Sequence, residues 1–197
     1  QLIKCTLQLV LWRSQKDNYK LLIESIKILH LPVEIIDELE IWKKECDKIK
    51  SHKLSALKSH DNVGTTTNYY QTGIPENLVS SSYWLAFTLR SCANLFGGNH
   101  RDYFIRKWEG HFDNYDIWIN YSYKWNFNPE HHHSGFLSGI IYFSNQDDTI
   151  FTNNNFKYRG EKGDMLLFPS STPHQVNVQE KDYERVTFAF NINRKDI

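Results

Sequence analysis

The sequence has no excess charge of either sign, because 23 Lys and Arg residues balance 23 Asp and Glu residues. A basic surface, the usual signature of proteins that bind nucleic acids or acidic membranes, is therefore not expected. The sequence also lacks an apolar run long enough to cross a bilayer and a charged-then-apolar start typical of a signal peptide. We expect no membrane partner, and nucleic acid is not an expected ligand.

Cysteine is scarce, with Cys5, Cys46 and Cys92 spread far apart. This number and spacing exclude a disulfide framework and a paired-cysteine zinc site, and they favour a reducing, intracellular compartment. Asn, Ile and Lys are abundant, as in proteins from AT-rich genomes, so we expect the cytoplasm of a microbe or of a phage-infected host. Aromatic residues make up 15% of the chain, which indicates a packed globular domain.

The first half of the chain has the pattern of helices. From about residue 18 to residue 58 apolar residues recur every three or four positions, and Pro32 divides this stretch in two. The apolar stripes are Leu21, Leu22, Ile26 and Leu29 before the proline, and Ile35, Ile36, Leu39 and Trp42 after it. A further helix is predicted from Val79 to about Phe96, with capping hydroxyls at Ser80–Ser82. Residues 59–73 are polar and predict a loop or short edge strands.

After Gly110, short runs of β-branched and aromatic residues alternate with polar turns, which predicts β-strands. The predicted strands are 116–123, 137–144, 149–152, 164–168 and 185–192, with shorter pieces at 156–158 and 175–178. Strands that follow a helical first half indicate an α+β fold, in which a β-sandwich or barrel is backed by helices. We expect one domain over 1–197, with a mainly helical support region at 1–110 and a β core at 111–197.

Three consecutive histidines, His131, His132 and His133, follow Asn128-Pro129-Glu130. In an extended strand alternate side chains point to the same face, so His131 and His133 can converge on one metal ion. Imidazole is a good ligand for Fe, Zn, Cu or Ni. Taken alone, the segment is equally consistent with a surface loop whose histidines are incidental.

A fourth histidine, His174, follows the apolar run 164–168 and a bend rich in Pro and Ser. A lone histidine of this kind is more often structural than functional. Here, however, two histidine segments lie about 40 residues apart, each beside a strand, as in a facial metal site with two nearby ligands and one distant ligand.

Arg185 opens the last predicted strand, and Thr187 lies two residues later on the same face. The planar guanidinium can bind a carboxylate through two hydrogen bonds, and the threonine hydroxyl can donate another. The competing interpretation is a surface arginine paired with Glu184 or Asp182.

Together these segments resemble the superfamily of 2-oxoglutarate- and Fe(II)-dependent oxygenases, and within it an uncharacterised group related to the prolyl hydroxylases. The resemblance covers roughly residues 110–192, and its order of motifs is more specific than any single motif. The motifs are Trp118-Ile119-Asn120, His131-His132-His133, Leu137-Ser138-Gly139-Ile140-Ile141-Tyr142, Gly163–Pro169, His174-Gln175-Val176 and Arg185-Val186-Thr187-Phe188-Ala189-Phe190-Asn191.

The resemblance implies a double-stranded β-helix, a jelly-roll or cupin-like barrel, buttressed by N-terminal helices. It implies Fe(II) and 2-oxoglutarate as cofactors, with ascorbate as a further candidate. The implied reaction is hydroxylation of an unactivated C–H bond by O₂, with succinate and CO₂ as co-products, on a peptidyl residue or a small molecule. It implies iron ligands at His131, His133 and His174, and a co-substrate pocket lined by Arg185, Thr187, Tyr142 and Asn120.

The ligand set has alternatives, because the superfamily usually has His-x-Asp or His-x-Glu where this chain has His131 and His133. The spacing to Ser138 also allows a second register. In that register Glu130, His132 and His174 would bind the metal, which keeps two histidines and one carboxylate. A third alternative has two histidine ligands only.

Two other function classes stay open. A cupin-type metalloenzyme that does not use 2-oxoglutarate would account for Gly163–His174. However, cupins usually have a glutamate shortly after His-x-His, and this chain has Leu137 and Ser138 there. The cupin interpretation also gives Arg185 no role. The other class is a non-catalytic β-barrel binding module with incidental histidines. The sequence does not indicate the substrate or the oligomeric state.

Overall fold

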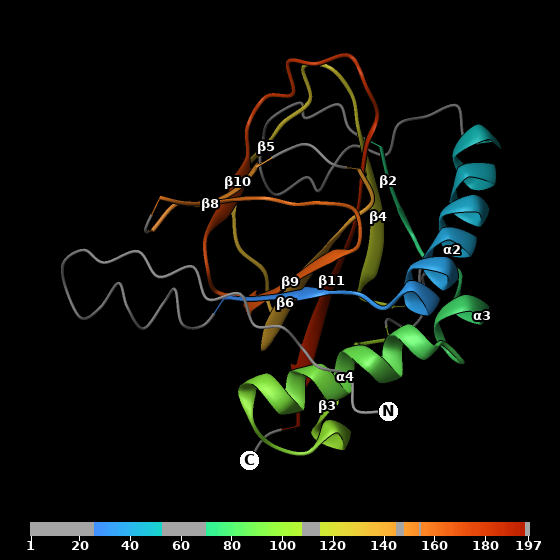
Figure 1. Ribbon diagram of the computed structural model, residues 1–197, viewed down its shortest axis with the longest axis vertical. Helices are drawn as coiled ribbons and strands as arrows, with labels where there is room; N and C mark the ends of the chain where they lie inside the picture. Colours follow the sequence, from blue (N-terminus) through green and yellow to red (C-terminus); the bar gives the residue numbers. More distant parts are fainter. Residues whose placement is uncertain (1–25, 53–69, 108–114, 145–147, 154, 196–197) are drawn as a thin grey trace.

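The computed structural model describes residues 26–52, 70–107, 115–144, 148–153 and 155–195 (Figure 1). Its helices are α2 (Val33–His52), α3 (Glu76–Val79), α4 (Tyr83–Phe96) and the 3-10 helix η2 (His100–Asp102). Its strands are β1 (Lys27–His30), β2 (Tyr70–Gly73), β3 (Tyr103–Phe104), β4 (Ile117–Ser122), β5 (Asn128–His131), β6 (Leu137–Tyr142), β7 (Asp148–Phe151), β8 (Phe156–Arg159), β9 (Asp164–Pro169), β10 (His174–Val176) and β11 (Arg185–Arg194). Within these ranges no helix has the length and apolar character needed to cross a membrane.

The strands form two antiparallel sheets. The larger sheet has the order β1-β9-β6-β11-β4-β2, with β3 also paired to β11, and the smaller sheet has the order β5-β10-β7-β8. From β4 onward the chain passes back and forth between them, since β4, β6, β9 and β11 belong to the larger sheet and β5, β7, β8 and β10 to the smaller. This alternation is the topology of a double-stranded β-helix, so the predicted fold class is confirmed.

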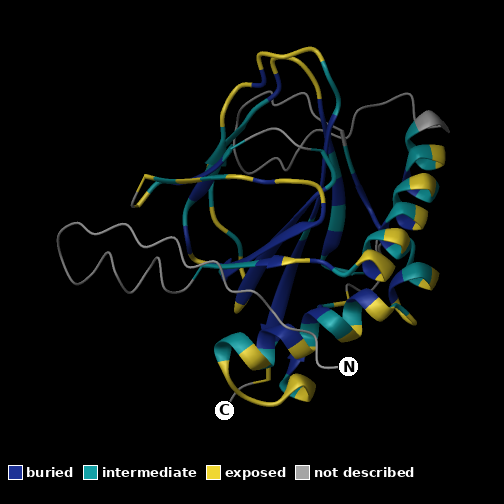
Figure 2. Cartoon of the chain, viewed as in Figure 1, coloured by how far each residue is buried: buried dark blue, intermediate teal, exposed yellow. Residues whose placement is uncertain are grey.

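Helices cover the outer face of the larger sheet (Figure 1). Trp42 of α2 and Trp84 of α4 pack edge to face, with 5.4 Å between ring centroids. Trp84 in turn contacts Phe190 of β11 at 5.0 Å, and Trp42 contacts Phe188 at 6.3 Å. Figure 2 shows the larger sheet buried beneath α2 and α4, whose outward sides are exposed. Removal of these aromatic rings from water is the main stabilising contribution of the helices.

A second apolar cluster fills part of the space between the two sheets. Ile140, Tyr142, Leu166 and Phe168 of the larger sheet meet Phe151 of the smaller sheet there. Alternation along each strand of the larger sheet therefore sends one set of side chains to the helices and the other set to the interior of the barrel.

Most predicted elements are confirmed. The five longer predicted strands correspond to β4, β6, β7, β9 and β11, and the two shorter pieces to β8 and β10. The helix after Pro32 is α2. The helix predicted from Val79 is divided by Ser80–Ser82, because Ser82 is the N-cap of α4 and accepts a hydrogen bond from the Leu85 N–H at 3.0 Å.

The helix predicted before Pro32 is wrong where the structure describes it. Lys27–His30 is the edge strand β1, which pairs with β9. Ile28 contacts the inner cluster and Leu29 the outer core, as expected of a strand that is apolar on both faces. Pairing with β9 outweighs the local helical spacing, since that spacing is only a weak preference. Leu21 and Leu22 lie outside the described residues.

The region before residue 111 also contributes strands β1, β2 and β3 to the larger sheet. The polar segment 59–73 contains β2, in agreement with the edge-strand alternative. β3 and β5 are strands that composition did not predict, because they are short and partly polar.

Candidate metal centre

Three histidines meet at one end of the smaller sheet. His131 ends β5, His174 begins β10, and the two residues are cross-strand partners. His133 lies two residues after His131, so its side chain returns to the same side. The ring centroids are 4.3 Å apart for His131 and His174, 5.0 Å for His131 and His133, and 5.3 Å for His133 and His174. One nitrogen from each ring lies within 4.8 Å of the others.

Backbone carbonyls orient two of these rings. The Nδ1 atom of His174 lies 3.0 Å from the Thr172 carbonyl, and the Nδ1 atom of His131 lies 2.7 Å from the Pro129 carbonyl. Because a carbonyl can only accept, Nδ1 carries the proton in both rings, and the lone pair is on Nε2. In His131 this lone pair accepts a hydrogen bond from the Asn128 amide at 3.4 Å, which a metal would replace. This arrangement is typical of metal-binding histidines.

Burial keeps His174 neutral. The residue is only 3% exposed to solvent. Burial, with a smaller contribution from His131 nearby, lowers the pKa of His174 to about 4. At neutral pH the imidazole is therefore uncharged, which is the form that binds metals.

Aromatic side chains surround the cluster. Phe168 of β9 lies 5.0 Å from the His174 ring and Phe151 of β7 lies 6.1 Å from it, both as centroid distances. Trp118 of β4 lies 5.7 Å from the His133 ring. Sequence reasoning gave these three residues no role, although strand alternation places Phe168 on the interior face. They place apolar surface along one side of the cluster.

The ligand atoms of the alternative set, Glu130, His132 and His174, do not converge in this structure. Glu130 and His132 are exposed, and neither belongs to the group of converging ligand atoms among the described residues. The reason is strand alternation, since the pleat that turns His131 and His133 inward turns their neighbours outward.

The predicted co-substrate residues form a polar row on the inner face of the larger sheet. Thr187 of β11 is the cross-strand partner of Asn120 on one side and of Tyr142 on the other. The Asn120 amide donates to the Thr187 hydroxyl at 3.3 Å, and the Tyr142 hydroxyl lies 2.5 Å from Thr149 Oγ1 of β7. Thr149 is a further residue beside this row that the sequence did not indicate.

Arg185 begins β11 beside this row and is only 6% exposed, which argues against a surface arginine. Burial raises the pKa of Tyr142 to about 12, and the nearby positive charge of Arg185 partly opposes this shift. Tyr142 is thus protonated at neutral pH and can donate a hydrogen bond. Asn120 Oδ1 is buried and has no hydrogen-bond partner among the described residues, as is common where a ligand or water binds.

The polar row and the histidines face the same interior. Trp118 and Asn120 lie on one face of β4, and Trp118 reaches His133 while Asn120 reaches Thr187. A cationic arginine, hydroxyl and amide groups therefore share one space with three imidazoles. The donor set fits a divalent transition metal, and the row fits a small dicarboxylate.

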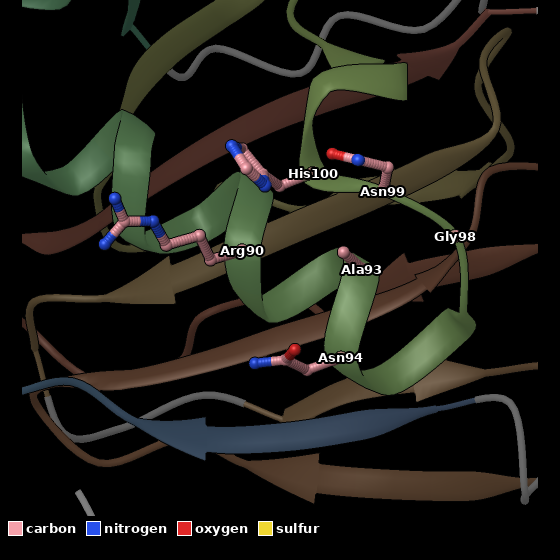
Figure 3. A pocket seen from close by; sticks show the side chains of 6 residues that line it. All are labelled: Arg90, Ala93, Asn94, Gly98, Asn99 and His100. Carbon is pink, nitrogen blue, oxygen red and sulfur yellow. The ribbon is translucent and has the colours of Figure 1, made fainter. Parts of the chain in front are cut away.

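A depression of about 450 Å³ lies on the surface between the end of α4 and the segment that follows it (Figure 3). It is lined by Arg90, Ala93, Asn94, Gly98, Asn99 and His100. None of the histidines of the cluster and none of the polar row contributes to it, so it is separate from the candidate centre.

Comparison with known proteins agrees with this chemistry. Residues 146–191 match a family described as putative 2OG-Fe(II) oxygenase, and no curated protein matches the sequence. A 2OG-Fe(II) oxygenase family oxidoreductase from Burkholderia pseudomallei is similar in structure, with a TM-score of 0.58 and 15% identity over 94% of this chain and 95% of that chain.

Two prolyl hydroxylases are also similar in structure. The viral collagen prolyl hydroxylase of Paramecium Bursaria Chlorella virus-1 has a TM-score of 0.56 and 12% identity over 87% of this chain and 97% of that chain. A Pseudomonas putida prolyl-4-hydroxylase has a TM-score of 0.54 and 12% identity over 87% of this chain and 93% of that chain. The family match over residues 146–191 and the similarity of fold thus agree with the resemblance of the sequence to the 2OG-Fe(II) oxygenases.

Proposed function

We propose that the protein is an Fe(II)- and 2-oxoglutarate-dependent hydroxylase with His131, His133 and His174 as its iron ligands. The observation that carries the proposal is the convergence of one nitrogen from each ring within 4.8 Å. Ligand nitrogens about 2 Å from a metal lie roughly 3 Å from one another. Small side-chain rotations would therefore let His131, His133 and His174 hold one metal ion together.

The ligand set determines the charge of the centre. Three neutral imidazoles add no negative charge, in contrast to the two histidines and one carboxylate usual in such oxygenases. The full charge of a divalent ion is therefore retained. This favours a doubly negative co-substrate such as 2-oxoglutarate, because the interaction takes place in a largely buried space.

The inner-face polar residues would bind and orient the co-substrate. Arg185 would hold its distal carboxylate through the guanidinium, with a hydrogen bond from Thr187, while Asn120 and Tyr142 line the sides. When bound, Fe(II) and 2-oxoglutarate supply the oxidation of a substrate C–H bond by O₂, with succinate and CO₂ as co-products. Trp118, Phe151 and Phe168 would limit the access of water to the histidines.

We further propose a peptidyl residue as the substrate. This is supported by the structural similarity to two prolyl hydroxylases, which is a likeness of fold. The balanced charge of the chain also favours a peptide or small molecule over nucleic acid.

Stimulation by ascorbate stays a prediction, as does a cytoplasmic location. In this proposal residues 111–197 are the catalytic part and 1–110 the support of one domain.

Anaerobic titration with Fe(II), with and without 2-oxoglutarate, tests the proposal. We expect a weak visible charge-transfer band that requires both components. Metal binding without any response to 2-oxoglutarate would favour the cupin-type alternative, and no metal binding would favour a binding module. Turnover assays with proline-containing peptides, followed by release of succinate, then test the substrate class separately.

A further inference from the structure

A buried chain of hydrogen bonds lies beside the candidate centre. Ser138 of β6, Ser170 after β9 and Asn191 of β11 are all buried. The Ser138 hydroxyl donates to Asn191 Oδ1 at 2.7 Å, and its oxygen lies 2.9 Å from the Ser170 hydroxyl. Since the Ser138 proton is used toward Asn191, Ser170 is the donor in the second bond. The Asn191 amide donates to Asp116 Oδ1 at 3.1 Å, so the chain runs in one direction and ends on a carboxylate.

Ser170 connects this chain to both histidine segments. Its carbonyl accepts a hydrogen bond from the His133 N–H at 2.9 Å. It lies in the turn between β9 and β10, where the Thr172 N–H bonds the Pro169 carbonyl at 2.9 Å and the Thr172 carbonyl in turn orients His174. One residue thus touches the loop that carries His133 and the turn that leads to His174.

The loop beyond His133 is packed against two of these side chains, Ser170 and Asn191. Gly135 has a φ of 144°, and a Cβ atom there would lie 3.1 Å from Ser170 Oγ and 3.6 Å from Asn191 Cβ. The Ser170 N–H bonds the Phe136 carbonyl at 3.3 Å, and the Phe136 N–H bonds the Ile192 carbonyl at 2.8 Å. Both ends of this short loop are therefore fixed to the buried cluster.

We propose that Ser138, Ser170 and Asn191 are positioning residues that set the place of His133 relative to His174 and so determine the affinity of the centre for its metal. This inference rests on the proposed metal function. Apolar side chains would fill the same space, but they would not define the position of the turn, because hydrogen bonds are directional and packing is not. Each of the three residues belongs to a segment that the resemblance singled out: Ser138 to Leu-Ser-Gly, Ser170 to Phe-Pro-Ser and Asn191 to Phe-Asn. The proposed co-substrate contacts do not involve these three residues.

The test is the binding of Co(II) by the full-length, metal-free protein, followed through the visible absorption of the complex. Ser170→Ala keeps the backbone bond to His133 and removes only the hydroxyl that fixes the turn. We therefore expect it to weaken Co(II) binding by roughly 10-fold, the lower end of the range found when direct outer-shell partners of metal ligands are removed. Asn191→Ala, which breaks the chain at its other end, should act in the same direction. Altered band intensity in both variants would show that the ligand geometry has changed.

Ser91→Ala is the matched control, because it makes the same substitution at a buried position on α4, which packs against the outer face of the larger sheet. It should leave Co(II) affinity within twofold of the wild type. The unfolding temperature of each metal-free variant separates stability from metal affinity. If Ser170→Ala does not fold, Ser138→Ala removes the adjacent hydroxyl with less disturbance of the turn.

The outcomes are distinct. If the wild type binds Co(II) and the Ser170 and Asn191 variants bind it equally well, the cluster is only structural and the inference is overturned. If Ser91→Ala weakens binding as much as Ser170→Ala, general loss of stability explains the effect and the inference is again overturned. If the wild type does not bind Co(II), the proposed metal centre fails and the inference fails with it.

Discussion

The two faces of β11 differ in chemistry although both are buried. Its outer face carries side chains of the helix-covered core, Val186, Phe188, Phe190 and Ile192. Its inner face carries polar side chains, Arg185, Thr187 and Asn191. A single strand therefore stabilises the fold on one side and presents hydrogen-bonding groups to the barrel interior on the other.

This difference separates stability from function. Burial of apolar side chains is favourable, whereas burial of a polar or charged group costs free energy unless it is hydrogen-bonded. A buried inner-face group with no hydrogen-bond partner among the described residues, such as Asn120 Oδ1, thus lowers the stability of the barrel. Sites where local rules are broken in this way are commonly functional, and here they lie next to three converging histidines.

The largest effect is expected on the outer face. Phe188 is fully buried between Phe143, at 4.9 Å, and Trp42. Phe188→Ala should lower the free energy of unfolding by about 3–5 kcal/mol, because it leaves a cavity beneath the helices. Urea unfolding measures the loss. The folded fraction should keep its affinity for 2-oxoglutarate, and a large loss of that affinity would contradict the separation of the faces.

The next effect is expected at the histidines. His174→Ala should weaken metal binding by more than about 100-fold, above the range for outer-shell residues, and should abolish metal-dependent turnover. His132→Ala is the control, since His132 is exposed beside the cluster. Isothermal titration with Co(II) compares the two variants. Loss of binding in the His132 variant would instead favour the set Glu130, His132 and His174.

Arg185→Ala should weaken 2-oxoglutarate binding by roughly 10- to 100-fold while sparing metal affinity, because a hydrogen-bonded charge partner is lost. Arg185→Lys keeps the charge but not the planar fork, so it should recover only part of the affinity. Titration of the metal-loaded protein under anaerobic conditions measures both. Equal co-substrate affinity in the wild type and the alanine variant would exclude the assigned role.

The smallest effect is expected at Thr187. Thr187→Val removes one hydroxyl at nearly constant volume and should weaken 2-oxoglutarate binding by no more than about tenfold, the contribution of one hydrogen bond. Thr187→Ser retains the hydroxyl and should bind nearly as well as the wild type. If Thr187→Val instead lowers the stability of the protein and leaves 2-oxoglutarate affinity unchanged, the role of Thr187 is structural, like that of the residues on the outer face of β11.

Local pattern was sufficient for much of the fold. Short runs of apolar, β-branched and aromatic residues between polar turns predicted β4, β6, β9 and β11, and Pro32 marked the start of α2. It failed for Lys27–His30, where helical spacing of apolar residues is also consistent with a strand that is apolar on both faces. Such a strand is recognised only from its partner, β9, which lies more than a hundred positions away in the sequence.

For the candidate site, the sequence by itself determined which residues could act together. The two-residue period of a strand puts His131 and His133 on one face, and Arg185 and Thr187 on one face, wherever those strands lie. Only the tertiary structure decided that His174 stands opposite His131, that Arg185 is buried and that Glu130 and His132 point outward. These features depend on the register between strands distant in sequence, which is set by the packing of the whole barrel and not by any local segment.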